Sequence, residues 1–80
     1  MMITIQLFAS LRESLGDTIE MEVPEPVTVG SLLDRFVEVH PQFKDALGAL
    51  NVAVDLEYSQ PSAQIEAGQE VAIFPPVSGG

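Results

Sequence analysis

The spacing of apolar residues changes along this chain from every second residue to every third or fourth and back again, and this order limits the possible folds. In residues 3–8 and 19–23 apolar residues alternate with polar ones, the pattern of a strand with one buried face. The linker between these segments contains Gly16 and Asp17, a turn signal. We therefore predict an antiparallel hairpin with a long loop.

A helical pattern follows the second strand. Apolar residues recur at helical intervals within residues 29–37, which predicts an amphipathic helix. Thr28 stands at its start, where a hydroxyl can accept a hydrogen bond from a free first-turn N–H. Pro41 is expected to end the helix because proline disfavours helical geometry at the preceding residue, His40. Residues 43–50 are predicted to hold a short helical turn.

The second half of the chain returns to short strands. Residues 52–54 are a short β-branched run, Ile65 precedes a turn signal at Ala67 and Gly68, and residues 70–74 are predicted to be the last strand. The order strand, strand, helix, short strands, strand predicts an α+β fold in which one main helix covers one face of a mixed sheet. We assign residues 1–74 to this domain and residues 75–80 to an extended, flexible C-terminal tail.

The chain is strongly acidic. Twelve Asp and Glu residues stand against three Lys and Arg, a formal net charge of −9 over 80 residues. Binding to nucleic acid or to an anionic membrane surface is therefore not expected. Apolar residues still make up 46% of the chain, which favours a folded protein over a disordered acidic tail. Neither a signal peptide nor a membrane span is recognisable, so we expect a cytoplasmic protein.

Few side chains suit catalysis. The chain contains no Cys and a single His, His40, which the dipole of the predicted helix favours as a C-terminal residue. Glu20 and Glu22 alternate with apolar residues on a strand, and Asp34 and Glu38 fall on the polar side of the helix, so solvated charges are expected. We predict neither a nucleophile–base pair nor a metal cluster.

The C-terminal segment combines stiffness with small size. Residues 75–80 read Pro-Pro-Val-Ser-Gly-Gly. Proline blocks further strand pairing and holds the chain extended, while glycine adds no side chain. Six extended residues span at most about 20 Å. The segment is either a frayed terminus or a thin arm that carries a carboxylate into the narrow active site of another protein.

Several segments together resemble a known family. They are Leu7-Phe8-Ala9, Leu11-Arg12-Glu13, Thr28-Val29-Gly30-Ser31-Leu32, Gly68-Gln69-Glu70-Val71-Ala72 and Phe74-Pro75-Pro76-Val77-Ser78-Gly79-Gly80. The chain is similar, nearly end to end, to the small subunits of molybdopterin synthase, which are sulfur carriers with the ubiquitin-like β-grasp fold. Two positions depart from the family pattern. Asp55 stands where an Asn usually follows a Val, and Gln69 replaces the usual Asp of a Gly-Asp-Glu turn.

The resemblance implies a reaction cycle at the terminal carboxylate. An adenylating enzyme uses ATP and magnesium to convert the carboxylate of Gly80, which follows Gly79, to an acyl-adenylate. A sulfur donor then replaces AMP and leaves a thiocarboxylate. The loaded carrier binds the large subunit of molybdopterin synthase, in an expected heterotetramer, and supplies sulfur for the dithiolene of the molybdenum cofactor. In this cycle the carrier is a non-catalytic subunit that binds no cofactor itself.

An interface is expected beside the tail. Phe8 and Phe74 are out of phase with the core-facing residues of their strands, and the first and last strands of a β-grasp sheet are neighbours. Both rings are therefore expected on the face away from the helix, as a docking site or beneath a crossing loop. By resemblance Tyr58 joins them and Arg12 lies near the partner-facing region, although Arg12 is almost as plausible as an ordinary solvated charge. The tail residues complete the predicted interface: Pro75, Pro76, Val77 and Ser78.

Two other functions stay open. A sulfur carrier of thiamine or cysteine biosynthesis would share the terminal Gly-Gly, although the Pro-Pro-Val-Ser run favours the molybdopterin branch. A ubiquitin-like modifier attached to target lysines is an alternative of a different class. Lys44 is the only lysine of the sequence, so chains built through internal lysines are nearly excluded, whereas single attachment is not.

Overall fold

The structure, a computed structural model, describes residues 1–76. The helices and strands alternate much as the apolar pattern does. In chain order they are β1 (Met2–Leu7), α1 (Ala9–Leu15), β2 (Thr18–Glu22), β3 (Val27–Thr28), α2 (Val29–Val39), the 3-10 helix η1 (Pro41–Ala49), β4 (Asn51–Val54), β5 (Glu57–Tyr58), β6 (Gln64–Ile65) and β7 (Val71–Phe74).

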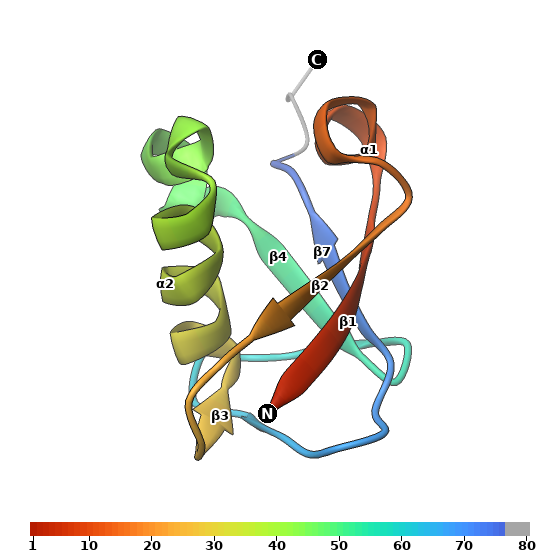
Figure 1. The fold of residues 1–80 in the computed structure, drawn as a ribbon, viewed down its shortest axis with the longest axis vertical. Helices are drawn as coiled ribbons and strands as arrows, with labels where there is room; N and C mark the ends of the chain where they lie inside the picture. The colour runs from red at the N-terminus through yellow and green to blue at the C-terminus, as the bar shows by residue number, and fades with distance from the viewer. Residues whose placement is uncertain (77–80) are drawn as a thin grey trace.

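The main sheet is mixed and has the strand order β2-β1-β7-β4-β5. β1 and β7 lie parallel at its centre, with Leu7 opposite Ile73, and the other pairs are antiparallel. A separate pair joins β3 to β6. Figure 1 shows α2 packed along one side of the sheet and α1 near the end at which β7 finishes.

The main helix begins at a capping box. Thr28 Oγ1 accepts a hydrogen bond from the Ser31 N–H at 3.1 Å, and Ser31 Oγ accepts one from the Thr28 N–H at 2.9 Å, so two donors at the helix start are satisfied. At the other end the His40 N–H donates to Phe36 O at 2.8 Å, and Pro41 follows. The predicted N-cap at Thr28 and the terminal place of His40 are both confirmed.

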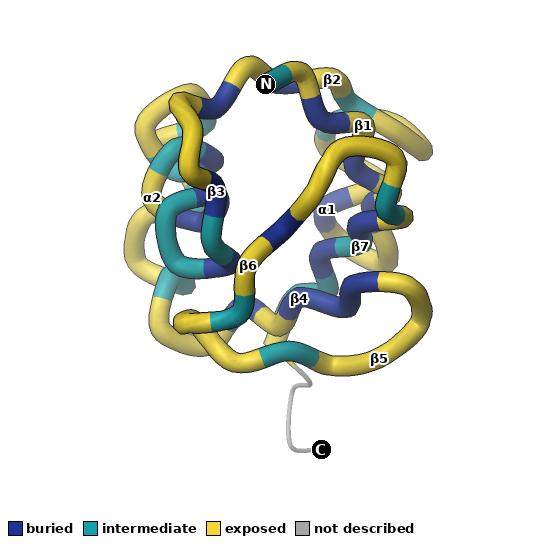
Figure 2. The backbone as a smooth tube through the Cα atoms, turned by 90° about the horizontal axis from the view of Figure 1, so that it is seen from below, coloured by how far each residue is buried: buried dark blue, intermediate teal, exposed yellow. Residues whose placement is uncertain are grey.

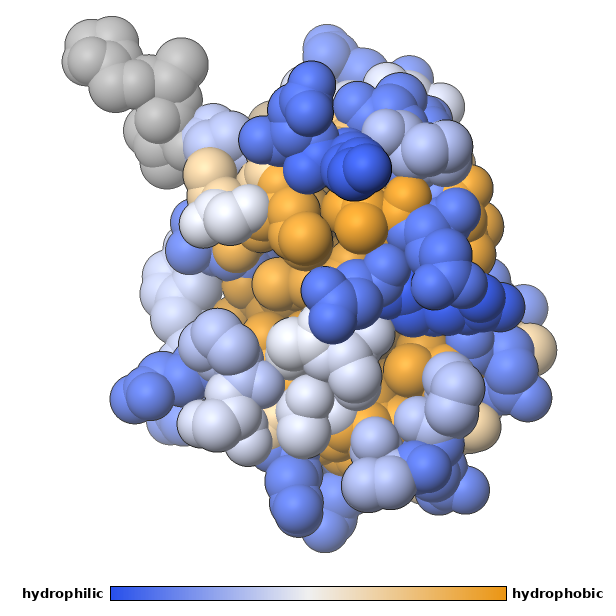
Figure 3. Space-filling view, turned by 90° about the vertical axis from the view of Figure 1, so that its left-hand side faces the viewer, coloured by the Kyte–Doolittle hydropathy of each residue, from blue (hydrophilic) through white to orange (hydrophobic). Residues whose placement is uncertain are grey.

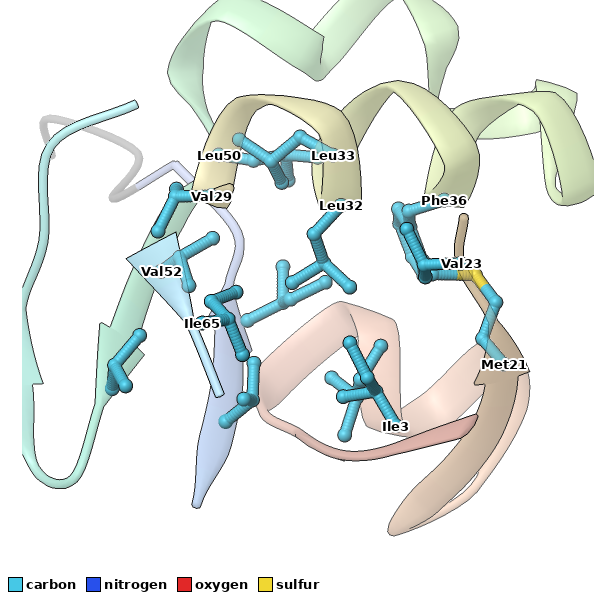
Figure 4. Close-up of a cluster of buried hydrophobic side chains, with 14 of the residues drawn as sticks. Ile3, Met21, Val23, Val29, Leu32, Leu33, Phe36, Leu50, Val52 and Ile65 are labelled. Carbon is cyan, nitrogen blue, oxygen red and sulfur yellow. The ribbon is translucent and has the colours of Figure 1, made fainter. Parts of the chain in front are cut away.

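The core lies between α2 and the facing side of the sheet. Figure 2 shows the buried segments turned inward between α2 and the strands, with exposed segments outside. In Figure 4 the helix residues Leu32 and Phe36 point toward the strands that carry Ile3 and Val52. Because the helix and the inner sheet face each offer one apolar surface, packing them together removes both from water.

Most of the predicted architecture is confirmed. The predicted strands at residues 3–8, 19–23, 52–54 and 70–74 correspond to β1, β2, β4 and β7, with bounds that differ by a residue or two. The main helix covers one face of a mixed sheet, as expected. The short strand at residue 65 is also present, as β6, and pairs with β3.

The long loop expected between the first two strands is wrong in part, because α1 occupies it. Leu11 is buried and Leu15 packs against the core, so a turn of helix there gains apolar burial that an open loop would lose. The turn expected at residues 43–50 is a longer 3-10 helix that begins at Pro41. Within residues 1–76 no helix is both long and apolar enough to cross a membrane.

Candidate functional site

Two phenylalanine rings stack on the face of the sheet that α2 leaves open. Leu7 and Ile73 are paired across β1 and β7 and point into the core. Because successive side chains of a strand point to opposite faces, the next residues, Phe8 and Phe74, share the outer face. Their ring centroids lie 4.5 Å apart with an interplanar angle of 14°. The predicted position of both rings away from the helix is confirmed.

Tyr58 of β5 extends this cluster. Its ring meets Phe74 edge-on, with centroids 5.7 Å apart and an interplanar angle of 62°. Tyr58 is 75% exposed and Phe8 37% exposed, so no described segment covers them, and the alternative of a crossing loop is wrong for residues 1–76. We call Phe8, Tyr58 and Phe74 the aromatic patch.

A shallow hollow of about 180 Å³ lies within and beside the aromatic patch. Ala53 and Ala72 line it and lie directly opposite each other on β4 and β7, so small side chains stand where the surrounding residues are large. The hollow is smaller than the clefts that enclose most small-molecule ligands. It suits an apolar side chain presented by another protein better than a substrate.

Arg12 borders the patch from α1. Phe8 and Arg12 line the same depression on the surface, and Arg12 Nε lies 3.7 Å from Asp17 Oδ1 with both side chains exposed. An exposed pair of this kind contributes at most about 1 kcal/mol to stability. Arg12 therefore remains available to an approaching partner, although the geometry equally suits a solvated charge.

The tail begins at the patch. Pro75 follows Phe74 directly, and Pro75 is half-buried while Pro76 is exposed. The other predicted tail residues, Val77, Ser78, Gly79 and Gly80, lie outside the described residues. The aromatic patch and the start of the tail thus occupy one end of the open sheet face.

The two departures from the family pattern contact each other, which sequence reasoning did not predict. Gln69 Nε2 donates to Asp55 Oδ2 at 3.0 Å, and the Glu70 N–H donates to Asp55 Oδ1 at 2.9 Å. The Asp55 N–H in turn donates to Glu70 O at 2.8 Å. These bonds clamp the turn between β4 and β5 onto the segment before β7. That turn also presents Leu56 at the rim of the hollow, a second residue that sequence reasoning missed.

The carboxylates considered as catalytic groups are solvated, as expected. Glu20, Glu22, Asp34 and Glu38 are all exposed, and Arg35 Nη1 binds Glu38 Oε1 at 2.6 Å. Figure 3 shows the α2 side of the molecule, where hydrophilic side chains are interspersed among hydrophobic ones. Within residues 1–76 no group of three carboxylates or imidazoles could hold a metal ion.

Comparison with known proteins places the chain in a family. The model of the ThiS family matches residues 5–80. Small archaeal modifier protein 1 of Haloferax volcanii is 36% identical, with 94% of this chain and 97% of that protein covered. The molybdopterin synthase sulfur carrier subunit of Arabidopsis thaliana is 33% identical, with 98% and 82% covered.

Solved structures agree with the fold. The crystal structure of SAMP1 from Haloferax volcanii has a TM-score of 0.79 and 34% identity over 99% of both chains. The structure shares with it the β-grasp arrangement of a mixed sheet and a covering helix. A family match that runs from the first strand to the terminal Gly-Gly, on a sheet that this relative also adopts, means that the chain belongs to the ThiS family.

Proposed function

We propose that the chain is the sulfur carrier subunit of molybdopterin synthase. The carboxylate of Gly80 is activated as an acyl-adenylate by an adenylating enzyme that uses ATP and magnesium, and a sulfur donor converts it to a thiocarboxylate. Activation is needed because a carboxylate is a poor electrophile, whereas a mixed anhydride with AMP has a good leaving group. The thiocarboxylate then supplies sulfur for the dithiolene of the molybdenum cofactor.

The observation that carries the proposal is the exposed aromatic patch at the point where the tail begins. Phe74 belongs to the patch, and Pro75 follows it with no intervening residue. A carrier needs a surface that a partner recognises and an arm that reaches the partner's active site. This chain has both at one end of the sheet, and its relatives include a molybdopterin synthase sulfur carrier subunit.

The length of the tail limits where the partner lies. Residues 75–80 span at most about 20 Å when extended, so an active site that takes Gly80 must open within that distance of Phe74. A globular protein so placed would cover the aromatic patch. Exposed aromatic residues with apolar neighbours are frequent anchors of protein interfaces. We therefore assign the patch, with Arg12 at its edge and the tail itself, to the interface with the large subunit.

Phe74→Ala tests this interface. We expect the dissociation constant for the large subunit to rise about tenfold or more. The Phe74 ring stacks on Phe8 and packs against Tyr58, so its loss removes one ring of the contact surface and the support of the other two. The melting temperature should fall only slightly, since Phe74 is half-buried. Calorimetric titration and thermal unfolding measure the two effects, and Val39→Ala, an exposed apolar residue on α2, is the control. A large loss of stability with unchanged affinity would instead identify Phe74 as a core residue.

The mass of the intact protein tests the terminal chemistry. When the chain is produced together with its activating enzyme and sulfur donor, we expect its mass to increase by the difference between one sulfur and one oxygen atom. The shift should map to the C-terminal peptide. An unchanged mass with active loading partners would contradict the sulfur-carrier function.

Protein modification is a second candidate, because a 36% identical relative is a small archaeal modifier protein. Both functions begin with adenylation of a terminal glycine, so the tail alone does not separate them. Denaturing immunoblots of cells that express the chain would reveal high-mass conjugates if it is attached to other proteins. Sulfur loading without conjugates favours the carrier.

A further inference from the structure

The turn between β4 and β5 holds an apolar residue in an unfavourable backbone conformation. Val54 pairs with Glu57, which leaves Asp55 and Leu56 as a two-residue hairpin loop, with φ of 51° and 70°. Positive φ at both positions is typical of a type I′ turn, which favours Asn, Asp or Gly. Asp55 meets this preference. For Leu56 the left-handed conformation is unfavourable because its Cβ crowds the following carbonyl oxygen.

Leu56 gains no burial in return. Its side chain is 88% exposed, so the isolated chain has both the backbone strain and the unfavourable hydration of an apolar group. Glycine or asparagine at this position would avoid both costs. Strain of this kind persists where the surrounding structure imposes it, and it concentrates at functional sites.

In this turn the positive φ values are imposed by the hydrogen bonds that join Asp55 to the segment before β7. Asp55 accepts hydrogen bonds from Gln69 Nε2 and from the Glu70 N–H, and its own N–H donates to Glu70 O. Gln69 is itself fixed, since its Oε1 accepts from the Glu66 N–H at 2.7 Å. Both the backbone and the side chain of Asp55 therefore bind the turn to the segment before β7. The backbone that carries Leu56 is thus fixed before a partner binds, which lowers the entropy cost of contact with it.

Leu56 is continuous with the aromatic patch. It lines the same hollow as Phe8, Tyr58 and Phe74. Phe74 and Val71 are the two ends of β7, and the turn lies beside the Val71 end because Val54 pairs with Val71. Three residues of strand span about 10 Å. The apolar surface thus extends about that far from the start of the tail.

The charges around the turn indicate the charge of the partner surface that would contact it. Asp55, Glu57 and Glu70 are exposed at this end of the surface. The basic residues of the sequence lie on other elements, namely Arg12 on α1, Arg35 on α2 and Lys44 on η1. A partner that covers this end would complement it with basic side chains around an apolar contact.

We propose that Leu56 is a preorganised anchor for the large subunit, at the end of the docking surface remote from the tail. The large subunit would receive it in an apolar pocket flanked by Lys or Arg side chains that face Asp55, Glu57 and Glu70. The position of the tail identifies the large subunit as the partner that contacts Leu56. The protein that takes up Gly80 must lie over the aromatic patch, and Leu56 lies next to this patch. This inference rests on the proposed function and adds a contact that determines affinity.

Leu56→Asn is the test, because asparagine tolerates positive φ and removes the apolar side chain. We expect the melting temperature to stay the same or rise, while the dissociation constant for the large subunit rises about tenfold, mainly through faster dissociation. Leu56→Met keeps an apolar side chain on the same strained backbone and should keep the affinity within about twofold. Surface plasmon resonance with the purified large subunit and thermal unfolding provide both readouts.

The possible results separate the two hypotheses. Unchanged affinity of Leu56→Asn, together with weakened binding of Phe74→Ala, would overturn the role of Leu56 and leave the proposed function standing. A fall in the melting temperature of Leu56→Asn would likewise overturn it, by showing that the leucine stabilises the fold. Absence of binding between the unaltered chain and the large subunit would overturn the proposed function itself.

Discussion

A chain without Gly80 is expected to fold normally and to transfer no sulfur. Deletion moves the terminal carboxylate back by one residue, about 3.3 Å or slightly more, so the arm no longer places it where the partner's catalytic groups act. A misplacement of even about 1 Å can reduce a rate a hundredfold. Gly79→Val should have a similar effect, because a branched side chain widens an arm that has to enter a narrow site. The measurement is dithiolene formation in the reconstituted pathway, with the thermal unfolding of each variant.

Gly48→Ala is the matched control for these variants. An added Cβ at Gly48 meets no atom within 4 Å, and the residue belongs to η1 and is neither part of the aromatic patch nor part of the tail. Sulfur transfer should therefore be unchanged. Full dithiolene production by the chain that lacks Gly80 would rule out the terminal carboxylate as the sulfur-carrying group.

Phe36→Ala is expected to lower the free energy of unfolding by about 3–5 kcal/mol, through lost burial and the cavity that remains. Phe36 is 0% exposed, and its ring stacks on Phe43 at 5.7 Å between centroids. A chain of this length has a total stability of only about 4–12 kcal/mol. The variant therefore loses a large part of its stability, and urea titration should show a clearly lower unfolding midpoint.

Phe43→Ala provides the comparison for Phe36→Ala. This substitution removes the other ring of the pair. Because Phe43 is half-buried, the free energy of unfolding should fall clearly less than it does in Phe36→Ala. Equal losses for both variants would mean that η1 belongs to the core as fully as α2 does. A loss below about 1 kcal/mol for Phe36→Ala would contradict the packing between α2 and the sheet.

The main helix and the longer strands could be predicted because each repeats its apolar period several times. The position of Phe8 and Phe74 could be predicted as well, from their phase relative to Leu7 and Ile73 and from the expected adjacency of their strands. α1 could not, because a helix of seven residues shows too little of a period and the turn signal at Gly16 dominated its surroundings. The strands β3 and β5 have two residues each, too few for an alternating pattern; β6 is as short, but Ile65 before a turn signal marked its position.

The turn at Leu56 lies outside sequence reasoning for a different reason. Leucine has no preference for positive φ, so nothing local indicates a type I′ turn at that residue. The clamp that imposes it joins Asp55 to Gln69 and Glu70, which follow 14 and 15 residues later. Only the pairing of β4 with β7 brings these segments together, and that pairing is a property of the whole sheet.

The central place of the parallel pair β1 and β7 has a consequence for synthesis of the protein. β1 spans Met2–Leu7 and β7 spans Val71–Phe74, so the sheet stays open until the ribosome has added residues 71–74. A translation product that stops before β7 lacks the strand that joins the two halves of the sheet. Such a product has neither an assembled aromatic patch nor a terminal glycine, so incomplete chains do not compete with complete ones for their partners. Folding itself thus selects the molecules that contain β7.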